Sequence, residues 1–245
     1  MLLVQRELKN SATKGSQNLK RTKLADRKLP DYTKGEEIFN MVSHITGGSL
    51  AIAALVLCIV TATFFGNVWG IVSGSIYGFT LILLYTMSSI YHGLTPIRPK
   101  KVFQVIDHCA IYFLIAGTYT PIAFGHLREI NPVTGWSLFA FAWGLCILGV
   151  VFTAIDLNRF KILSMILYIG MGWCVVLIIG PLLQSIALTG VILLFAGGIA
   201  YTTGSVLYGL GKKRRYMHGA FHLFVILGSL LHFFCIIFYV LPIKK

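Results

Sequence analysis

The chain has 245 residues, of which 56% are hydrophobic and 12% are charged, and its formal net charge is +13. Soluble domains carry about 25% charged residues, so this composition, with a mean hydropathy of +0.79, excludes an ordinary soluble domain. The charges are segregated, and the apolar runs between them reach the length of about 20 residues that a membrane-spanning helix needs. Such runs are too long and too evenly apolar for the alternating strands of a membrane barrel. The sequence therefore predicts an all-α membrane protein.

Residues 1–35 form a separate basic segment. They contain nine of the 21 Lys and Arg residues and few large apolar residues after Val4. Such a segment buries too little apolar surface to fold alone, so we predict a mobile basic tail, without the continuous apolar stretch of a signal peptide. Anionic lipid headgroups are its expected partner, because each nearby Lys or Arg adds about 1 kcal/mol of attraction. Nucleic acid is not an expected partner, since membrane topology accounts for the positive charge.

Residues 36–245 are predicted to form one seven-helix transmembrane domain. The spans are expected near residues 41–65, 70–92, 105–126, 136–156, 161–183, 188–210 and 217–241. The tail and the loops near 93–104, 157–161 and 211–216 then carry 18 Lys and Arg residues on one side, against three on the other. Cytoplasmic loops carry the excess of positive charge. We therefore expect the N-terminus in the cytoplasm and the C-terminus outside.

Polar side chains gather, in this topology, at the cytoplasmic ends of the spans. Ser88 and His92 lie four residues apart at the end of the second span, and Asp107 lies near the start of the third. His218 and His222 open the seventh span with the same spacing. Residues four apart share one helix face, and ionisable groups at membrane depth are functional by default. The sequence therefore predicts one shared functional site.

These residues fit a catalytic zinc site. Such a site has three protein ligands and one water, whereas a structural site is usually closed by four protein ligands. We predict that His92, His218 and His222 bind Zn²⁺. Asp107 is predicted to orient or deprotonate the water, and Ser88 to hydrogen-bond the water or the developing oxyanion. The alternative for each histidine is an interfacial side chain, with its ring in lipid and its polar edge in water.

A polar stripe at the start of the first span is a second group of candidates. Glu37, Asn40 and His44 share one helix face because their spacings are three and four. They are expected either to support the metal ligands or only to mark a helix start with an acid in its first turn. Both interpretations stay open. His108 lies about 100° around the helix from Asp107 and is expected to be an interfacial side chain.

Six short segments give the chain a specific signature. They are residues 36–44 (EEIFNMVSH), 88–92 (SSIYH), 107–112 (DHCAIY) with 116–121 (AGTYTP), 167–173 (LYIGMGW), 197–204 (GGIAYTTG) and 218–222 (HGAFH). From about residue 36 to residue 240 the chain thereby resembles the hemolysin III family, bacterial relatives of the adiponectin and progestin receptors. One departure is Ser43, where relatives often have Thr, and the change keeps the hydroxyl.

The resemblance implies a seven-helix fold with zinc on the cytoplasmic side. The family's SxxxH, Asp and HxxxH elements match Ser88 with His92, Asp107, and His218 with His222. No departure occurs at these ligand positions.

The resemblance also implies a function. The wider superfamily includes ceramidases and is viewed as a group of metal-dependent, lipid-directed amide hydrolases. We therefore expect a zinc-dependent hydrolase in the bacterial cytoplasmic membrane, which cleaves an amide or ester of a lipid-like substrate and affects membrane lipid homeostasis. Two alternatives stay open. One is a non-enzymatic, receptor-like sensor or membrane regulator with structural zinc, and the other is a cytolytic pore.

Overall fold

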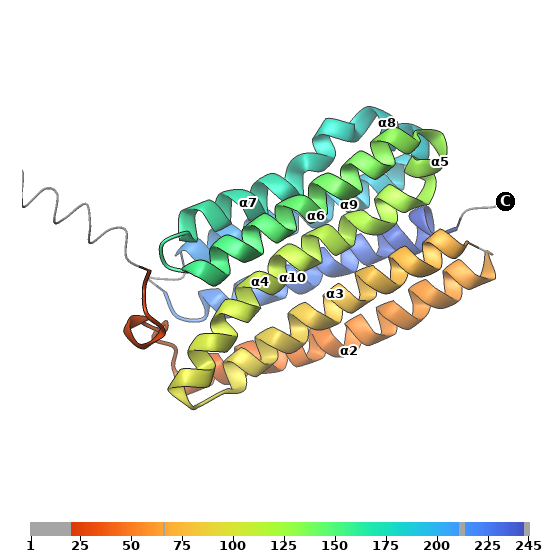
Figure 1. Ribbon diagram of the computed structural model, residues 1–245. Helices are drawn as coiled ribbons and strands as arrows, with labels where there is room; N and C mark the ends of the chain where they lie inside the picture. The colour runs from red at the N-terminus through yellow and green to blue at the C-terminus, as the bar shows by residue number, and fades with distance from the viewer. Residues whose placement is uncertain (1–20, 66, 211–213, 243–245) are drawn as a thin grey trace, which may run out of the picture.

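The protein is a bundle of long helices. The computed structural model describes residues 21–65, 67–210 and 214–242, and all regular secondary structure in these ranges is helical. Seven helical segments of this described part are long and apolar enough to cross a membrane. Figure 1 shows them running along one another in a single elongated bundle. The prediction of an all-α, seven-helix membrane bundle is confirmed.

The helices follow the predicted spans, with differences at their ends. In chain order they are η1 Leu24–Asp26, α2 Lys34–Phe64, α3 Val68–Gly93, α4 Ile97–Ile122, η2 Ala123–Leu127, α5 Arg128–Ile130, α6 Pro132–Ile155, α7 Lys161–Trp173, η3 Cys174–Ile178, α8 Ile179–Ser185, α9 Leu188–Leu210, α10 Met217–Cys235 and η4 Ile236–Val240. The third span begins at Ile97 rather than near residue 105. Its first turns hold Arg98, Lys100 and Lys101, which an apolar pattern does not detect.

One end of the bundle, here called the basic end, collects the start of α2 and the connections α3–α4, α6–α7 and α9–α10 (Figure 1). The last described helix, η4, lies at the opposite end. The described basic residues of these connections and their flanking turns are Arg98, Lys100, Lys101, Arg159, Lys161, Arg214 and Arg215. The charge asymmetry seen in the sequence thus corresponds to one end of the fold. That this end faces the cytoplasm stays a prediction.

The N-terminal segment lies against the basic end. Residues 1–20 of the predicted mobile tail lie outside the described residues. Residues 21–33 contact the bundle, and the Thr22 N–H donates a hydrogen bond of 2.6 Å to Oδ2 of Asp156, the C-cap residue directly after α6. The segment's own composition does not reveal this docking, because its partners come from a distant connection.

Helix α2 starts earlier than the predicted 41. Thr33 and Glu36 form a capping box: each side chain accepts a hydrogen bond from the backbone N–H of the other residue. This arrangement satisfies two N–H groups that a helix start otherwise leaves unpaired. The cap at Thr33 places Glu37 and Asn40 inside the helix, one and two turns from its start.

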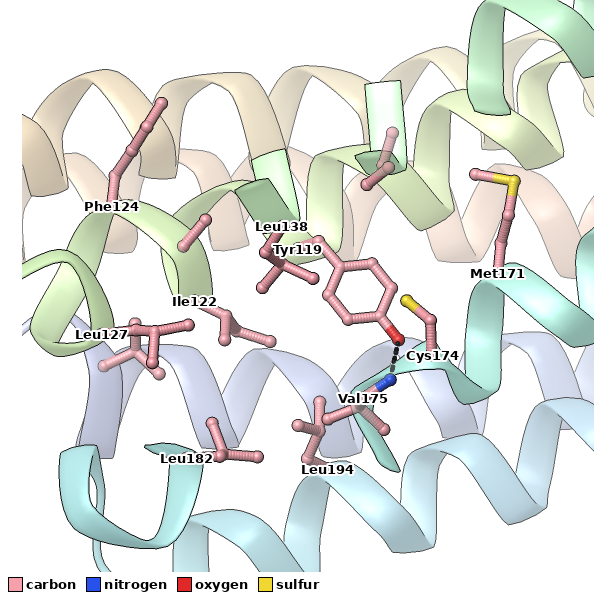
Figure 2. Packing of buried hydrophobic residues seen from close by; sticks show 14 of the residues in the cluster. Tyr119, Ile122, Phe124, Leu127, Leu138, Met171, Cys174, Val175, Leu182 and Leu194 are labelled. Atoms are coloured by element: carbon pink, nitrogen blue, oxygen red, sulfur yellow. Dashed lines mark hydrogen bonds between the residues drawn. The ribbon is translucent and has the colours of Figure 1, made fainter. Parts of the chain in front are cut away.

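The fifth span is broken near its middle, where α7 passes through η3 into α8. The Tyr119 hydroxyl of α4 accepts a hydrogen bond of 3.2 Å from the Val175 N–H (Figure 2) and donates one of 2.9 Å to the Gly172 carbonyl. Pro181 has no N–H to continue the helical ladder. Unpaired backbone groups are costly in hydrocarbon, so the Tyr119 hydroxyl makes this break tolerable.

Hydrophobic packing holds the helices around this break. Leu138 of α6, Met171 of α7 and Leu194 of α9 are at most 5% exposed and belong to the same buried cluster as Tyr119 (Figure 2). Lipid tails are as apolar as these side chains, so close van der Waals packing, rather than removal from water, favours this contact.

Candidate metal centre

Three histidine side chains meet at the basic end of the bundle. His92 lies in the last turn of α3, and His218 and His222 lie in the first two turns of α10. The Nε2 atom of His218 is 3.2 Å from Nε2 of His92 and 3.1 Å from Nε2 of His222. Zinc–nitrogen bonds of about 2.0–2.1 Å in a tetrahedral site put neighbouring nitrogens about 3.3 Å apart. These two spacings fit a single zinc ion, and the ligand atoms of the three histidines all lie within 4.8 Å of one another.

The ring of His92 is oriented by a carboxylate. Its Nδ1 lies 2.6 Å from Oε2 of Glu37, and the other carboxylate oxygen lies 2.9 Å from Nζ of Lys100. A carboxylate only accepts hydrogen bonds, so Nδ1 of His92 carries the proton. In the neutral ring, Nε2 then presents a lone pair toward the other two histidines.

The ring of His222 is oriented by the backbone of α2. Its Nδ1 lies 3.2 Å from the Asn40 carbonyl oxygen and 3.2 Å from Oγ of Ser43. Ser43 gives its own hydroxyl proton to that carbonyl, so both oxygens accept from Nδ1–H of His222. The Nε2 atom of His222 therefore also presents a lone pair. A cation is the natural partner for lone pairs that converge in this way.

Close approach of α10 to α2 makes these contacts possible. A Cβ atom at Gly219 would lie 2.5 Å from Cδ1 of Phe39 and 3.2 Å from Oδ1 of Asn40. The glycine between the two α10 histidines thus lets the helix pack against the polar stripe of α2.

His218 differs from the other two histidines. Its Nδ1 is buried and has no hydrogen-bond partner among the described residues. Aromatic rings surround it instead: Tyr32 stacks on it at a centroid distance of 5.1 Å, and Tyr208 is tilted against it at 5.5 Å. Burial raises the pKa of the Tyr32 phenol, so this ring stays neutral beside the imidazole.

Asp107 and Ser88 lie next to the histidines. Both line the same cavity as His218 and His222. Within the described residues, the set of mutually close metal-ligand atoms contains the three histidines and not Asp107. The carboxylate therefore lies beside the ligand set, where a water molecule can separate it from an ion.

The other candidates are placed as follows. The side-chain amide of Asn40 has no hydrogen-bond partner in the described chain, so its backbone carbonyl makes the contact with the site. His44 stacks on His222 with ring centroids 3.6 Å apart. Neither ring nitrogen of His44 has a hydrogen-bond partner among the described residues. His108 turns its Nδ1 to the Gln104 carbonyl, 2.7 Å away. It stands outside the ligand set.

A cavity of about 150 Å³ extends from the site between α4, α7, α9 and α10. Its lining is mainly apolar, with Ser88 and Asp107 near the histidines and His232 further along α10. His232 is fixed by the Leu194 carbonyl, 3.0 Å from its Nε2. The site therefore combines polar groups at one end with an apolar chamber.

Sequence reasoning missed three residues of this centre. Ser43, which contacts Nδ1 of His222, was noted only as a departure from the family pattern. Lys100, which holds Glu37, was counted only as a loop charge, and Tyr32, which covers His218, was assigned to the tail. The capping pair Thr33 and Glu36 was a usable signal, because it predicts an ordered helix start directly after Tyr32. No local pattern indicated the contact made by Lys100.

A comparison with protein families identifies the chain. The family model described as "Haemolysin-III related" matches residues 32–233, which is most of the chain. The chain belongs to this family. It is therefore a haemolysin-III-related, multi-pass membrane protein, and the histidine centre lies within the matched region.

Individual relatives agree with this assignment. The "Hemolysin-3 homolog" of Bacillus subtilis (strain 168) is 41% identical over 208 residues, which cover 85% of this chain and 96% of that protein. "Hemolysin-3" of Bacillus cereus is 41% identical over 207 residues, 84% of this chain and 93% of that protein. The human "Monocyte to macrophage differentiation factor" is 25% identical over 175 residues, 69% of this chain and 70% of that protein. No solved structure is significantly similar to this chain.

Proposed function

We propose that this haemolysin-III-related protein is a zinc-dependent membrane hydrolase that cleaves an amide or ester bond of a lipid-like substrate. The observation that carries the proposal is the convergence of three imidazole nitrogens within 4.8 Å of one another. His92, His218 and His222 would hold the ion, and imidazole is a preferred ligand of zinc. Three protein ligands leave one position open, as in catalytic zinc sites.

The residues beside the ligand set suit hydrolysis. A bound zinc ion supplies Lewis-acid activation of water near neutral pH. Asp107 is the base: it takes a proton from water as the water oxygen bonds to the carbonyl carbon, and it returns that proton to the leaving nitrogen or oxygen. The bond from carbon to the leaving atom breaks, which yields a carboxylic acid and an amine or alcohol. Ser88, which lines the same cavity as Asp107, would hydrogen-bond the water or the developing oxyanion.

The surroundings of the site support a lipid-like substrate. The cavity is lined mainly by apolar side chains, which accommodate an acyl chain better than a charged solute. Ile169 of α7 lines this cavity and is also 40% exposed, which supports entry from the surrounding lipid beside α7. Residues 21–33 lie across the basic end and favour the lateral route over direct entry from water.

Metal analysis and hydrolysis of a lipid panel test this proposal together. Wild-type protein is expected to contain about one zinc ion per chain and to hydrolyse at least one acyl amide or ester. His92→Ala should lose the metal. Asp107→Asn should keep the metal and lose turnover by about 100-fold or more, in the range of general base catalysis. His126→Gln, at the opposite end of the bundle, is the matched control and should change neither.

Other outcomes favour the alternative functions. Stoichiometric zinc without hydrolysis of any lipid in the panel would favour a sensor or regulator with structural metal. The name of the Bacillus cereus relative, "Hemolysin-3", is the reason to test lysis directly. Dye release from liposomes made of ether lipids, which contain no hydrolysable acyl bond, would favour a pore. The hydrolase proposal predicts no dye release from these liposomes.

A further inference from the structure

Residues 21–33 form a strap across the basic end, fixed at both ends. At its start, Thr22 donates to Asp156 in the α6–α7 connection. In its middle, Nζ of Lys101 donates a hydrogen bond of 2.7 Å to the Ala25 carbonyl. Its last residue, Thr33, is joined to Glu36 by the capping box of α2. The strap is therefore tied to three separate parts of the bundle.

Tyr32, near the end of this strap, lies over the histidine centre. Its ring is nearly parallel to that of His218, with an interplanar angle of 19° and centroids 5.1 Å apart. The same ring touches His92 with centroids 5.9 Å apart and an angle of 52°. One aromatic side chain thus contacts two of the three proposed ligands.

The contact with His218 has a specific consequence. Metal-binding histidines are ordinarily oriented by a hydrogen bond on the nitrogen that does not bind the metal. Nδ1–H of His92 donates this bond to Glu37, and Nδ1–H of His222 donates it to the Asn40 carbonyl of α2. Nδ1 of His218 has no such bond in the described chain. Its rotation about the Cβ–Cγ bond is restrained by ring contacts, of which that with Tyr32 is the stacked one.

We propose that Tyr32 is a positioning residue that replaces the missing hydrogen bond: its stacked ring holds His218 with Nε2 toward His92 and His222. The strap carries Tyr32 to this position, so release of the strap frees the third imidazole. This inference rests on the metal site of the proposed function and adds a residue to it. Stacking needs the ring and not the hydroxyl, which separates the proposal from a role of the phenol in proton transfer.

Zinc affinity, measured in the full-length protein by competition with a chromophoric chelator, tests the proposal. Tyr32→Phe keeps the ring and should bind zinc within about twofold of wild type. Tyr32→Ala should weaken zinc binding by about 10–100-fold, the usual effect of losing a residue that orients a ligand. Tyr239→Ala removes an aromatic ring at the other end of the bundle and should leave zinc affinity unchanged.

The absorption spectrum of the Co²⁺-loaded protein gives a second readout that general destabilisation does not move. The d–d bands should differ between Tyr32→Ala and wild type and should be the same for Tyr32→Phe and wild type. If Tyr32→Ala does not fold, the double variant Asp156→Asn with Lys101→Ala removes two of the three attachments of the strap without changing Tyr32, and it should also weaken zinc binding. Wild-type affinity and spectrum in Tyr32→Ala, or in this double variant if it is used, would overturn this inference alone. A wild-type protein that binds neither metal overturns the metal site as well.

Discussion

Nδ1 of His92 lies 2.6 Å from Oε2 of Glu37, and the two residues come from different helices, α3 and α2. Lys100 of α4 holds the other oxygen of the same carboxylate at 2.9 Å. This chain of contacts fixes both the tautomer and the direction of the His92 ring. It also means that the proposed ligand set depends on the packing of three helices and not on the histidines alone.

Glu37→Ala should weaken zinc binding by about 10–100-fold, because carboxylates that orient a metal-binding histidine contribute this much to affinity. Lys100 would lose its carboxylate partner in the same variant. The measurement is chelator competition on purified protein. Glu129→Ala removes an exposed carboxylate at the opposite end of the bundle and serves as the control. Equal affinities of Glu37→Ala and wild type would contradict the role of this contact.

Gly172→Phe should block substrate without removing the metal. Gly172 lines the cavity, and a Cβ added there has no neighbour within 4 Å, so a phenyl ring can fill the space. We expect the zinc content to stay at the wild-type level and turnover of long-chain substrates to fall by at least about 10-fold, because the acyl chain loses its place in the cavity. Gly144→Phe, also at an open position but outside the cavity lining, should leave turnover unchanged. Undiminished turnover in Gly172→Phe would show that substrate does not use this cavity.

Tyr119→Phe should destabilise the fold without touching the metal centre. The hydroxyl serves both Val175 N–H and the Gly172 carbonyl at the break of the fifth span. Leaving buried backbone groups unpaired costs about 1–3 kcal/mol. Unfolding in mild detergent should therefore begin at a lower temperature, with zinc affinity retained in the folded protein. Tyr239→Phe is the matched control, since the Tyr239 hydroxyl makes no hydrogen bond within the described residues.

Docking of the strap should be sensitive to acid through Asp156. Burial acts to raise the pKa of this carboxyl, but hydrogen bonds from the N–H groups of Thr22, Arg159 and Asn158 outweigh it and hold the pKa below the ordinary value of 3.8. The ionised Asp156 carboxylate therefore stabilises the docked strap at pH values above 3.8, its ordinary pKa. This stabilisation is lost as the pH falls through the lowered pKa that the carboxyl has in the folded protein.

Hydrogen exchange at the Thr22 amide measures this docking. In metal-free protein its protection factor should be constant from neutral pH to about pH 5 and should decline below about pH 4. Asp156→Asn should show low protection at every pH, because the amide side chain is a weaker acceptor than the carboxylate. A protection factor in wild type that does not change down to pH 2 would exclude Asp156 as the anchor.

Much of the bundle could be predicted from the sequence because hydropathy and helical spacing are local properties. The run from residue 188 to residue 210 gives the same bounds in sequence and structure, and the spacing of His218 and His222 predicts their shared face. The convergence with His92 followed from the topology: four spans lie between the second and the seventh, so these two spans run in opposite directions, and the end of the second lies at the same face as the start of the seventh.

The rest could not be predicted because it depends on contacts between distant segments. The break in the fifth span lies inside a continuous apolar run, and its partner Tyr119 is on another helix. The contact of Tyr32 with His218 joins residues that lie 186 positions apart in the sequence. A basic composition predicts solvation for residues 21–33, whereas Asp156 and Lys101 provide partners that the segment itself does not reveal.

Zinc K-edge absorption spectroscopy of the purified wild-type protein tests whether the three histidines bind zinc. We expect about one zinc ion per chain, with three imidazole nitrogens at about 2.0–2.1 Å and one further light-atom ligand. Replacing His92, His218 or His222 by Ala should each remove the ion. Protein from zinc-replete cells that contains no zinc, or a zinc spectrum that is unchanged in all three variants, would contradict zinc binding by these histidines.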